Sequence, residues 1–235
     1  SINAIASTYG PGLIGGLIVG SSFAKGLAIS QNKKLVPINH LQAHLLSPRL
    51  TNDIKFPYLC LLVSGGNTAL VVVKNPSKFI TLGSTIDDSA GECFDKVAKA
   101  LDLGYPGGPA IERLAINGDP SSFLLPKPLT KVKNCDFSFS GLKTAAIEII
   151  KRNKINKKFL NDFTASFQFT VGEIFKKKIF NALDDLKKEN FIIKDFSICG
   201  GVAANKYLNS LLKNFIEERD INHHKVPLLL CRDNA

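Results

Sequence analysis

The 235-residue sequence contains neither methionine nor tryptophan, and its five cysteines lie at least 32 residues apart. Without a C-x-x-C pair the cysteines form no small disulfide scaffold, and reduced thiols in a cytosol fit their spacing best. We therefore predict a cytoplasmic protein. Because even the first residue is not methionine, we expect the sequence to be an internal piece of a longer chain.

Acidic residues are missing before Asp53, and the first 24 residues carry no charge at all. An uncharged N-terminal stretch raises the question of a signal peptide or a membrane span. Glycines, Pro11 and several polar residues interrupt this stretch, however, and no basic residues precede it. The sequence therefore predicts a buried βα unit and no association with a membrane.

The remaining composition is that of a basic globular protein. Hydrophobic residues make up 45% of the chain and charged residues 21%, which excludes intrinsic disorder and a collagen-like fold. Thirty Lys and Arg residues against twenty Asp and Glu residues give a formal net charge of +10. This surplus favours a polyanionic partner, which can be a nucleic acid, a phosphorylated ligand or an acidic surface.

Hydrophobic periodicity and turn residues divide the chain into two parts near Phe56-Pro57. Residues 1–56 are expected to be the remaining part of a first lobe, formed by one βαβ unit and a short helix. The expected elements of this part are strands at 2–6 and 35–38 and helices at 13–31 and 40–46.

Residues 57–235 are expected to form a second lobe, in which an antiparallel three-stranded meander is extended by parallel βα units. The expected strands are residues 58–64, 69–74, 79–86, 196–199 and 226–230. The expected helices are residues 88–102, a helix opening at 106–109, and residues 141–152, 159–189 and 203–218. The alternation of strands and helices predicts an α/β fold.

His40 and His44 stand four residues apart, so a helix places both imidazoles on one face, where both can reach one metal ion. The alternative is a pair of surface or capping histidines. A zinc-protease motif would require a glutamate directly after the first histidine, and Leu41 stands there. Zinc-dependent proteolysis is therefore disfavoured.

The stretch from Gly10 to Gly15 satisfies the G-x-G-x-x-G pattern of a dinucleotide-binding turn. The same fingerprint requires an acidic residue about twenty positions later, which this chain lacks. Lys33 and Lys34 can instead meet a 2′-phosphate, so an NADP enzyme stays an alternative. The other interpretation is that these glycines permit close packing of a helix.

Two further glycine-rich turns follow predicted strands, at residues 64–68 and 200–205. The first is either an ordinary hairpin turn or a loop whose backbone N–H groups cradle phosphate oxygens. The second opens a predicted helix, where free N–H groups favour an anion. Together, at strand ends in one lobe, they indicate a cleft for a phosphorylated ligand.

Charged residues gather in two later segments. Residues 87–96 hold four carboxylates, of which Asp95 is suited to a ribose hydroxyl or an amino group, or else to an ion pair with Lys99. Lys143 follows a Ser/Gly helix start and is suited to a phosphate contact. Positive charge is concentrated at Lys127, Lys131, Lys133, Lys143, Lys151, Arg152, Lys154, Lys157 and Lys158. Such residues are either a solvated face or an RNA-binding surface.

Eight separated motifs occur here in the order found in one family. They are Gly10-Pro11-Gly12-Leu13, His40-x-x-x-His44, Leu62-Val63-Ser64-Gly65-Gly66, Asp87-Asp88-x-x-Gly91-Glu92-x-Phe94-Asp95-Lys96, Tyr105-Pro106-Gly107-Gly108-Pro109, Phe137-Ser138-Phe139-Ser140-Gly141-Leu142-Lys143, Gly200-Gly201-Val202-x-x-Asn205 and Asp233-Asn234. With these motifs the chain resembles the tRNA N6-adenosine threonylcarbamoyltransferase family, formerly described as O-sialoglycoprotein endopeptidases. The resemblance spans nearly the whole sequence.

The resemblance implies the actin-like two-lobed fold of sugar kinases and Hsp70 (ASKHA, ribonuclease H-like), truncated here at both ends. It also implies an acyltransferase that moves the threonylcarbamoyl group from threonylcarbamoyl-AMP to N6 of an adenosine in tRNA. That adenosine lies next to the anticodon in tRNAs reading codons that begin with A. The implied partners are tRNA, threonylcarbamoyl-AMP and the other proteins of the threonylcarbamoylation complex.

The resemblance also implies roles for individual positions. His40, His44 and Asp233 match the metal ligands, with Fe(II) as the usual ion and Zn(II) as the other choice, and no catalytic residue beyond the metal site is implied. The positions that match the adenylate-binding residues are Leu62, Val63, Ser64, Gly65, Gly66, Asp95, Gly108 and Asn205. A cation suits this chemistry, because it polarises the carbamoyl carbonyl and stabilises the leaving phosphate.

The chain departs from the family pattern in two respects. Gln42 stands where many members have an acidic residue, which affects the surroundings of the metal rather than a ligand position. The segments that precede Ser1 and follow Ala235 in the family are absent, so we expect residues 1–235 alone to be inactive or poorly folded. The alternative functions are a small-molecule kinase with the same fold and a non-catalytic paralogue that acts as a binding subunit.

Overall fold

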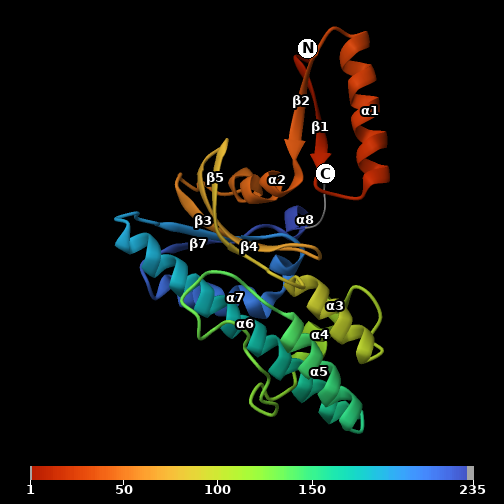
Figure 1. Ribbon diagram of the computed structural model, residues 1–235, viewed down its shortest axis with the longest axis vertical. Coiled ribbons are helices and arrows are strands. Elements are labelled where there is room, and N and C mark those ends of the chain that lie inside the picture. The colour runs from red at the N-terminus through yellow and green to blue at the C-terminus, as the bar shows by residue number, and fades with distance from the viewer. Residues whose placement is uncertain (1, 232–235) are drawn as a thin grey trace.

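A parallel βαβ unit forms one end of the molecule in the computed structural model, which describes residues 2–231 (Figure 1). Its strands β1 (Ala4–Gly10) and β2 (Lys34–Asn39) pair in parallel, and α1 (Ile14–Ser30) connects them and packs beside β1. The unit confirms the expected βαβ order, but the expected burial was wrong, because β1 has no buried residue and only Ala24 and Ala28 of α1 are buried. The first strand, however, begins and ends later than the predicted residues 2–6, because pairing with β2 continues to Gly10.

A five-stranded mixed sheet forms the centre of the rest of the chain, with the strand order β5-β4-β3-β6-β7. Its strands are β3 (Tyr58–Val63), β4 (Thr68–Asn75), β5 (Lys78–Ser84), β6 (Asp195–Cys199) and β7 (Asn222–His224). The first three strands pair antiparallel, whereas β6 pairs parallel to β3 and β7 parallel to β6. The predicted meander with a parallel extension is therefore confirmed.

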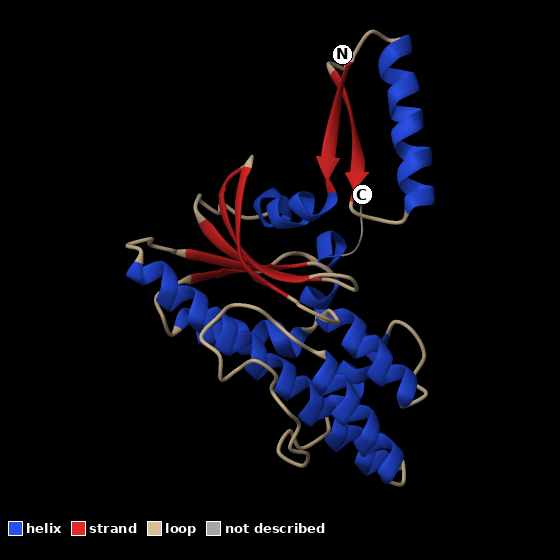
Figure 2. Ribbon diagram, viewed as in Figure 1, coloured by secondary structure: helices blue, strands red, loops and turns tan. Residues whose placement is uncertain are grey.

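Helices cover both faces of this sheet (Figure 2). One face carries a thick layer formed by α3 (Ala90–Ala100), α4 (Gly107–Ala115), α5 (Ser140–Arg152), α6 (Lys157–Lys188) and α7 (Lys206–Glu217). The other face carries α2 (His40–Leu46) and the 3-10 turn η1 (Ser47–Leu50). The helix layer on the first face encloses the larger core.

Strand β3 shows how the sequence builds this two-sided core. All six of its residues are buried, as expected for a central strand covered on both faces. Successive side chains alternate between the faces, so Leu59 and Leu61 join the core beneath α3 to α7, whereas Cys60 and Leu62 pack toward α2. The five cysteines are all buried and none forms a disulfide.

The C-terminal part differs from the sequence prediction at two places. A strand was expected at residues 226–230, but the edge strand is β7, and residues 228–231 form the short helix α8 (Leu228–Cys231). The reason is Pro227, which lacks an N–H for strand pairing and whose carbonyl instead accepts the N–H of Leu230. The helix expected at 203–218 is divided at Asn205, whose extended backbone separates the 3-10 turn η2 (Gly201–Ala204) from α7.

Among the helices within residues 2–231, none has both the length and the apolar character needed to cross a membrane.

Candidate active site

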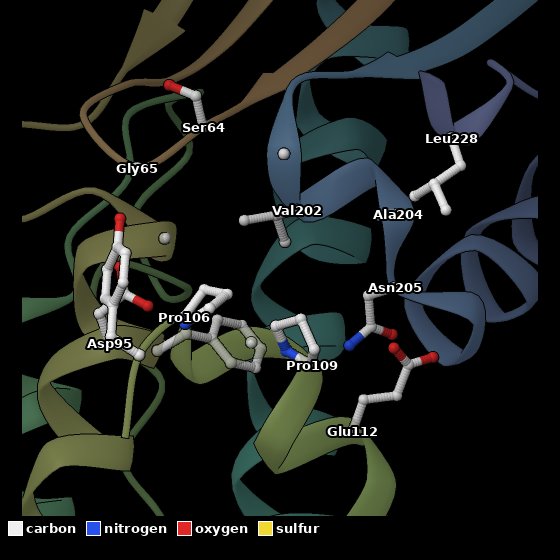
Figure 3. A pocket seen from close by; sticks show the side chains of 15 residues that line it. Ser64, Gly65, Asp95, Pro106, Pro109, Glu112, Val202, Ala204, Asn205 and Leu228 are labelled. Atoms are coloured by element: carbon white, nitrogen blue, oxygen red, sulfur yellow. The ribbon is translucent and has the colours of Figure 1, made fainter. Parts of the chain in front are cut away.

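A cavity of about 560 Å³ opens where β3 and β6 end and the helix layer begins (Figure 3). Its walls come from the turn after β3, from α3 and α4, from η2 and the start of α7, and from α8. Five residues predicted to hold the adenylate line this cavity: Ser64, Gly65, Asp95, Gly108 and Asn205. Residues more than 140 positions apart in the sequence thus share one site.

The other three residues predicted to hold the adenylate do not line the cavity. Leu62 and Val63 are buried within β3, where their side chains belong to the two cores. Gly66 lies at the exposed tip of the turn that joins β3 to β4. Leu62 and Val63 therefore anchor the strand that leads into the turn, and Gly66 is part of the turn itself.

Glycines hold the cavity walls together by direct backbone contact. A Cβ atom on Gly91 in α3 would overlap the carbonyl group of Ser64. A Cβ on Gly200, whose φ of 89° favours glycine, would lie 2.5 Å from the carbonyl oxygen of Val63. A Cβ on Gly107 would lie 2.7 Å from the carbonyl oxygen of Phe94. These glycines therefore have a packing role, and Gly200 has it within the turn that the sequence predicted to face an anion.

Ser89 ties the turn after β3 to the first turn of α3. Its hydroxyl donates to the carbonyl oxygen of Gly65 at 2.6 Å and accepts the N–H of Glu92 at 3.1 Å as the cap of α3. Within the turn, the Ser64 hydroxyl accepts the N–H of Asn67 at 3.0 Å. The turn is thus both a tight hairpin connection and one wall of the cavity.

Asp95 connects two helices at the cavity wall. Its Oδ1 accepts the backbone N–H of Gly107 at 2.7 Å, which satisfies a free donor at the start of α4. The N-cap residue of α4 is Pro106, which has no side chain able to do this. The alternative ion pair between Asp95 and Lys99 is absent among the described residues.

Asn205 is buried and uses both ends of its amide. Its Oδ1 accepts the N–H of Leu208 as the cap of α7, and its Nδ2 donates to Oε1 of Gln168 at 2.6 Å. These bonds fix the orientation of the amide at the cavity wall (Figure 3).

Two residues with polar side chains, Glu112 and Tyr105, line the cavity but were not among the predicted adenylate-binding residues. Glu112 lies one helical turn after Gly108, and its Oε1 accepts the N–H of Lys206 at 2.6 Å, which joins α4 to α7. That spacing was the available signal. Tyr105 is 85% exposed although it lines the cavity, and its place in the same motif as Gly108 was the available signal.

The two predicted metal-ligand histidines lie on α2, on the opposite face of the sheet from the helix layer. Their ring centroids are 4.6 Å apart, and His44 is 95% buried, with 5% of its surface exposed. Asn39 caps the helix, and the hydroxyl of Tyr58 donates to the carbonyl oxygen of Leu45 at 2.8 Å. These contacts hold α2, and with it the histidine pair, against β3 rather than in bulk solvent.

The third predicted ligand, Asp233, lies outside the described residues. Within residues 2–231, no three His, Cys, Asp or Glu side chains are placed to hold one metal ion. The described histidines thus provide two adjacent imidazole donors, and the three-ligand set stays a prediction.

The neighbouring carboxylates Asp87 and Asp88 organise the start of α5. Burial would raise the pKa of Asp87, but hydrogen bonds from the hydroxyls of Ser138 and Ser140 and from the N–H of Phe139 outweigh it and lower that pKa. Asp88 pairs with Lys143. Lys143 is therefore engaged with a carboxylate rather than free for the phosphate contact that its position in the sequence suggested.

Comparisons with known proteins decide the family. A model of the family "tRNA N6-adenosine threonylcarbamoyltransferase" matches residues 1–235. The chain belongs to this family. The tRNA N6-adenosine threonylcarbamoyltransferase of Rickettsia bellii is 51% identical over 239 residues, which cover all of this chain and 69% of the relative. The enzyme of the same name from Wolbachia pipientis wMel is 47% identical over 234 residues, with the same coverage.

Solved structures confirm the actin-like α/β fold. HypF from T. kodakarensis superimposes with a TM-score of 0.71 at 14% sequence identity, over 99% of this chain and 39% of HypF. A full-length HypF in the phosphate- and nucleotide-bound form gives a TM-score of 0.63 over 90% of this chain and 36% of that protein. At this identity the likeness concerns the fold alone. Membership of the threonylcarbamoyltransferase family does not favour the kinase, the NADP enzyme or the non-catalytic paralogue.

Proposed function

We propose that this protein is an acyltransferase that attaches a threonylcarbamoyl group to N6 of adenosine in tRNA. The observation that carries the proposal is the match to relatives of that name, one of them 51% identical over the whole chain. The net charge of +10 suits an RNA substrate. In finer detail, the acceptor is the adenosine next to the anticodon in tRNAs that read codons beginning with A.

The donor that fits the cavity is threonylcarbamoyl-AMP. The bare backbone at Gly65 and Gly108 and the helix starts around the cavity suit an adenylate phosphate, because free N–H groups and helix dipoles stabilise anions. Oδ1 of Asp95 accepts the hydrogen bond from the Gly107 N–H, and its Oδ2 can accept a hydrogen bond from a ribose hydroxyl. Glu112 and the fixed amide of Asn205 offer further polar contacts at the same wall.

A divalent metal ion, Fe(II) or Zn(II), fits the histidine pair on α2. Two imidazoles with this spacing on one helix face suit either ion, and we propose Asp233 as the third ligand. When bound, the ion would polarise the carbamoyl carbonyl and neutralise charge on the leaving phosphate. The packing of α2 and the hydrogen bond from Tyr58 to the carbonyl oxygen of Leu45 hold the buried His44 in place. The residues of the cavity walls would orient the adenylate.

The remaining parts of the proposal concern the cell. We place the protein in the cytoplasm, where its tRNA substrate is found, without a membrane association. We also expect it to act with the other proteins of a threonylcarbamoylation complex.

Depletion of the full-length protein tests this function. Mass spectrometry of tRNA nucleosides should show loss of threonylcarbamoyladenosine, and re-expression of the wild-type protein should restore it. Re-expression of an Asp95→Ala variant at equal abundance should restore less, because the cavity wall is altered. Unchanged threonylcarbamoyladenosine after depletion would overturn the assignment.

A further inference from the structure

A strongly basic turn joins α5 to α6 and is defined here as residues 151–158. All eight residues are exposed, five of them are Lys or Arg, and none is acidic. Figure 1 shows this turn at the lower end of the helix layer, at the opposite end of the molecule from the βαβ unit of β1, α1 and β2. The cavity lies between these two ends, at the strand ends beside α3 and α4.

Most of the charge in the basic turn is not neutralised by the protein. Arg152 pairs with Glu148 at 3.6 Å, and Lys158 pairs with Asp162 at 2.7 Å. Across residues 2–231, no carboxylate forms an ion pair with Lys151, Lys154 or Lys157. Three ammonium groups therefore project from one exposed turn with their charge available to a partner.

Helix stability does not account for the basic turn as a whole. Lys151 and Arg152 lie in the last turn of α5, where cations interact favourably with the helix dipole. Lys157 and Lys158, by contrast, begin α6, and the first turn of α6 holds no acidic residue. Cations at a helix start interact unfavourably with the helix dipole. A feature that opposes local stability points to a function outside the folded chain.

We propose that the basic turn binds the phosphate backbone of the substrate tRNA, away from the adenosine that reacts. The proposal rests on the proposed function. The cavity opens at the strand ends beside α3 and α4, whereas the basic turn lies at the far end of the helix layer, so the turn would contact a part of the tRNA other than the reacting adenosine. Lys side chains recognise backbone phosphates without reading sequence, so the turn would position the tRNA rather than select it.

The test compares two full-length triple variants with equal loss of charge. The first is Lys151→Gln, Lys154→Gln and Lys157→Gln. The control is Lys78→Gln, Lys194→Gln and Lys225→Gln, whose exposed lysines lie at the start of β5, directly before β6 and directly after β7. The Kd for an unmodified tRNA transcript is measured between about 50 and 200 mM salt. Equal melting temperatures of both variants and wild type establish that the folds are intact.

The basic-turn variant should bind tRNA more weakly, and its slope of log Kd against log salt should decrease by about 2 to 3, the loss expected for three phosphate contacts. The control should keep the wild-type slope. The KM for tRNA should rise in the basic-turn variant, whereas kcat at saturating tRNA and the affinity for AMP should stay at wild-type values.

Two outcomes would overturn the inference. A wild-type slope in the basic-turn variant would show that these lysines do not contact tRNA. If the same variant also lost its assembly with partner proteins, the lysines would instead bind an acidic protein surface. An equal change in the control would show that total charge matters and not this turn. Failure of the proposed function looks different, because the wild-type protein would then form no threonylcarbamoyladenosine in any tRNA.

Discussion

Oδ1 of Asp95 lies 2.7 Å from the backbone nitrogen of Gly107 and accepts its hydrogen bond. The two residues belong to different helices, so this bond fixes the start of α4 against α3. Both helices line the cavity. Asp95 therefore shapes the site through the backbone, in addition to any contact of its second oxygen with a ligand.

Replacement of Asp95 separates these two roles. Asp95→Ala removes the acceptor and should lower the free energy of unfolding by about 1 to 2 kcal/mol, because the Gly107 N–H loses its partner. Asp95→Asn keeps a carbonyl oxygen at the same place and should cost less than half as much. Urea unfolding of both variants measures the difference. Equal stability of Asp95→Ala and wild type would show that the bond has no structural value.

Gly91 offers a second test. Helix propensity predicts that Gly91→Ala raises the free energy of unfolding, whereas packing predicts that it lowers this free energy. Alanine is favoured over glycine inside a helix by about 1 kcal/mol, yet a Cβ at position 91 overlaps the carbonyl group of Ser64. We expect Gly91→Ala to destabilise the protein by about 1 to 3 kcal/mol and to weaken AMP binding, because the turn after β3 must move.

The matched control for that variant is Gly66→Ala, in the same turn that Gly91 contacts. No atom lies within 4 Å of a Cβ placed on Gly66, and its φ is not positive. Thermal unfolding should therefore give Gly66→Ala a melting temperature near that of wild type. A Gly91→Ala protein that is as stable as the control would contradict the close contact.

The sequence predicted those parts of the molecule that depend on local patterns. Alternation and turn residues located the meander from β3 to β5, and the spacing of His40 and His44 placed both rings on one face of α2. Partners chosen by tertiary packing were not accessible in this way. The bond from the Lys206 backbone to Glu112 joins residues 94 positions apart, and the β7 strand formed upstream of the apolar run at 226–230.

His223 should make stability depend on pH. Burial lowers its pKa from the ordinary 6.5 to about 4, and its buried Nε2 has no hydrogen-bond partner among the described residues. The unfolded chain then binds more protons than the folded chain between these two values. The free energy of unfolding contributed by neutral His223 is therefore complete above about pH 6.5 and decreases as the pH falls toward 4.

Urea unfolding at several pH values tests this dependence against a His223→Leu variant, which has no proton to bind. The variant should show a flatter profile than wild type between pH 6.5 and 4. Carboxylates such as Asp87 and Asp119 have lowered pKa values and lose their contribution mainly below this range. Parallel profiles for the two proteins would mean that His223 protonates as easily in the folded state as in the unfolded one.

Lys178 holds the long connection between α4 and α5 against α6. Its side chain is fully buried, and its ammonium donates to the carbonyl oxygen of Leu129 at 2.8 Å, to Oδ1 of Asn134 at 2.8 Å and to the carbonyl oxygen of Asn134 at 3.1 Å. Burial lowers the pKa of Lys178, because it disfavours the charged ammonium. Hydrogen bonds to the surrounding oxygens offset this cost of burying a lysine.

Lys178→Met keeps the aliphatic stem but leaves three acceptors without this donor, so we expect the free energy of unfolding to fall by about 2 to 4 kcal/mol. Asn181 still donates to the carbonyl of Asn134 at 2.8 Å, which limits the loss. The control is Lys177→Met, one residue earlier, where the ammonium lies 5.3 Å from the ring of Phe180 and the cost should be below about 1 kcal/mol. Denaturant unfolding distinguishes the two variants, and limited proteolysis should cleave the connection near Leu129 faster in Lys178→Met alone. If both substitutions cost the same, the buried ammonium does not hold the connection in place.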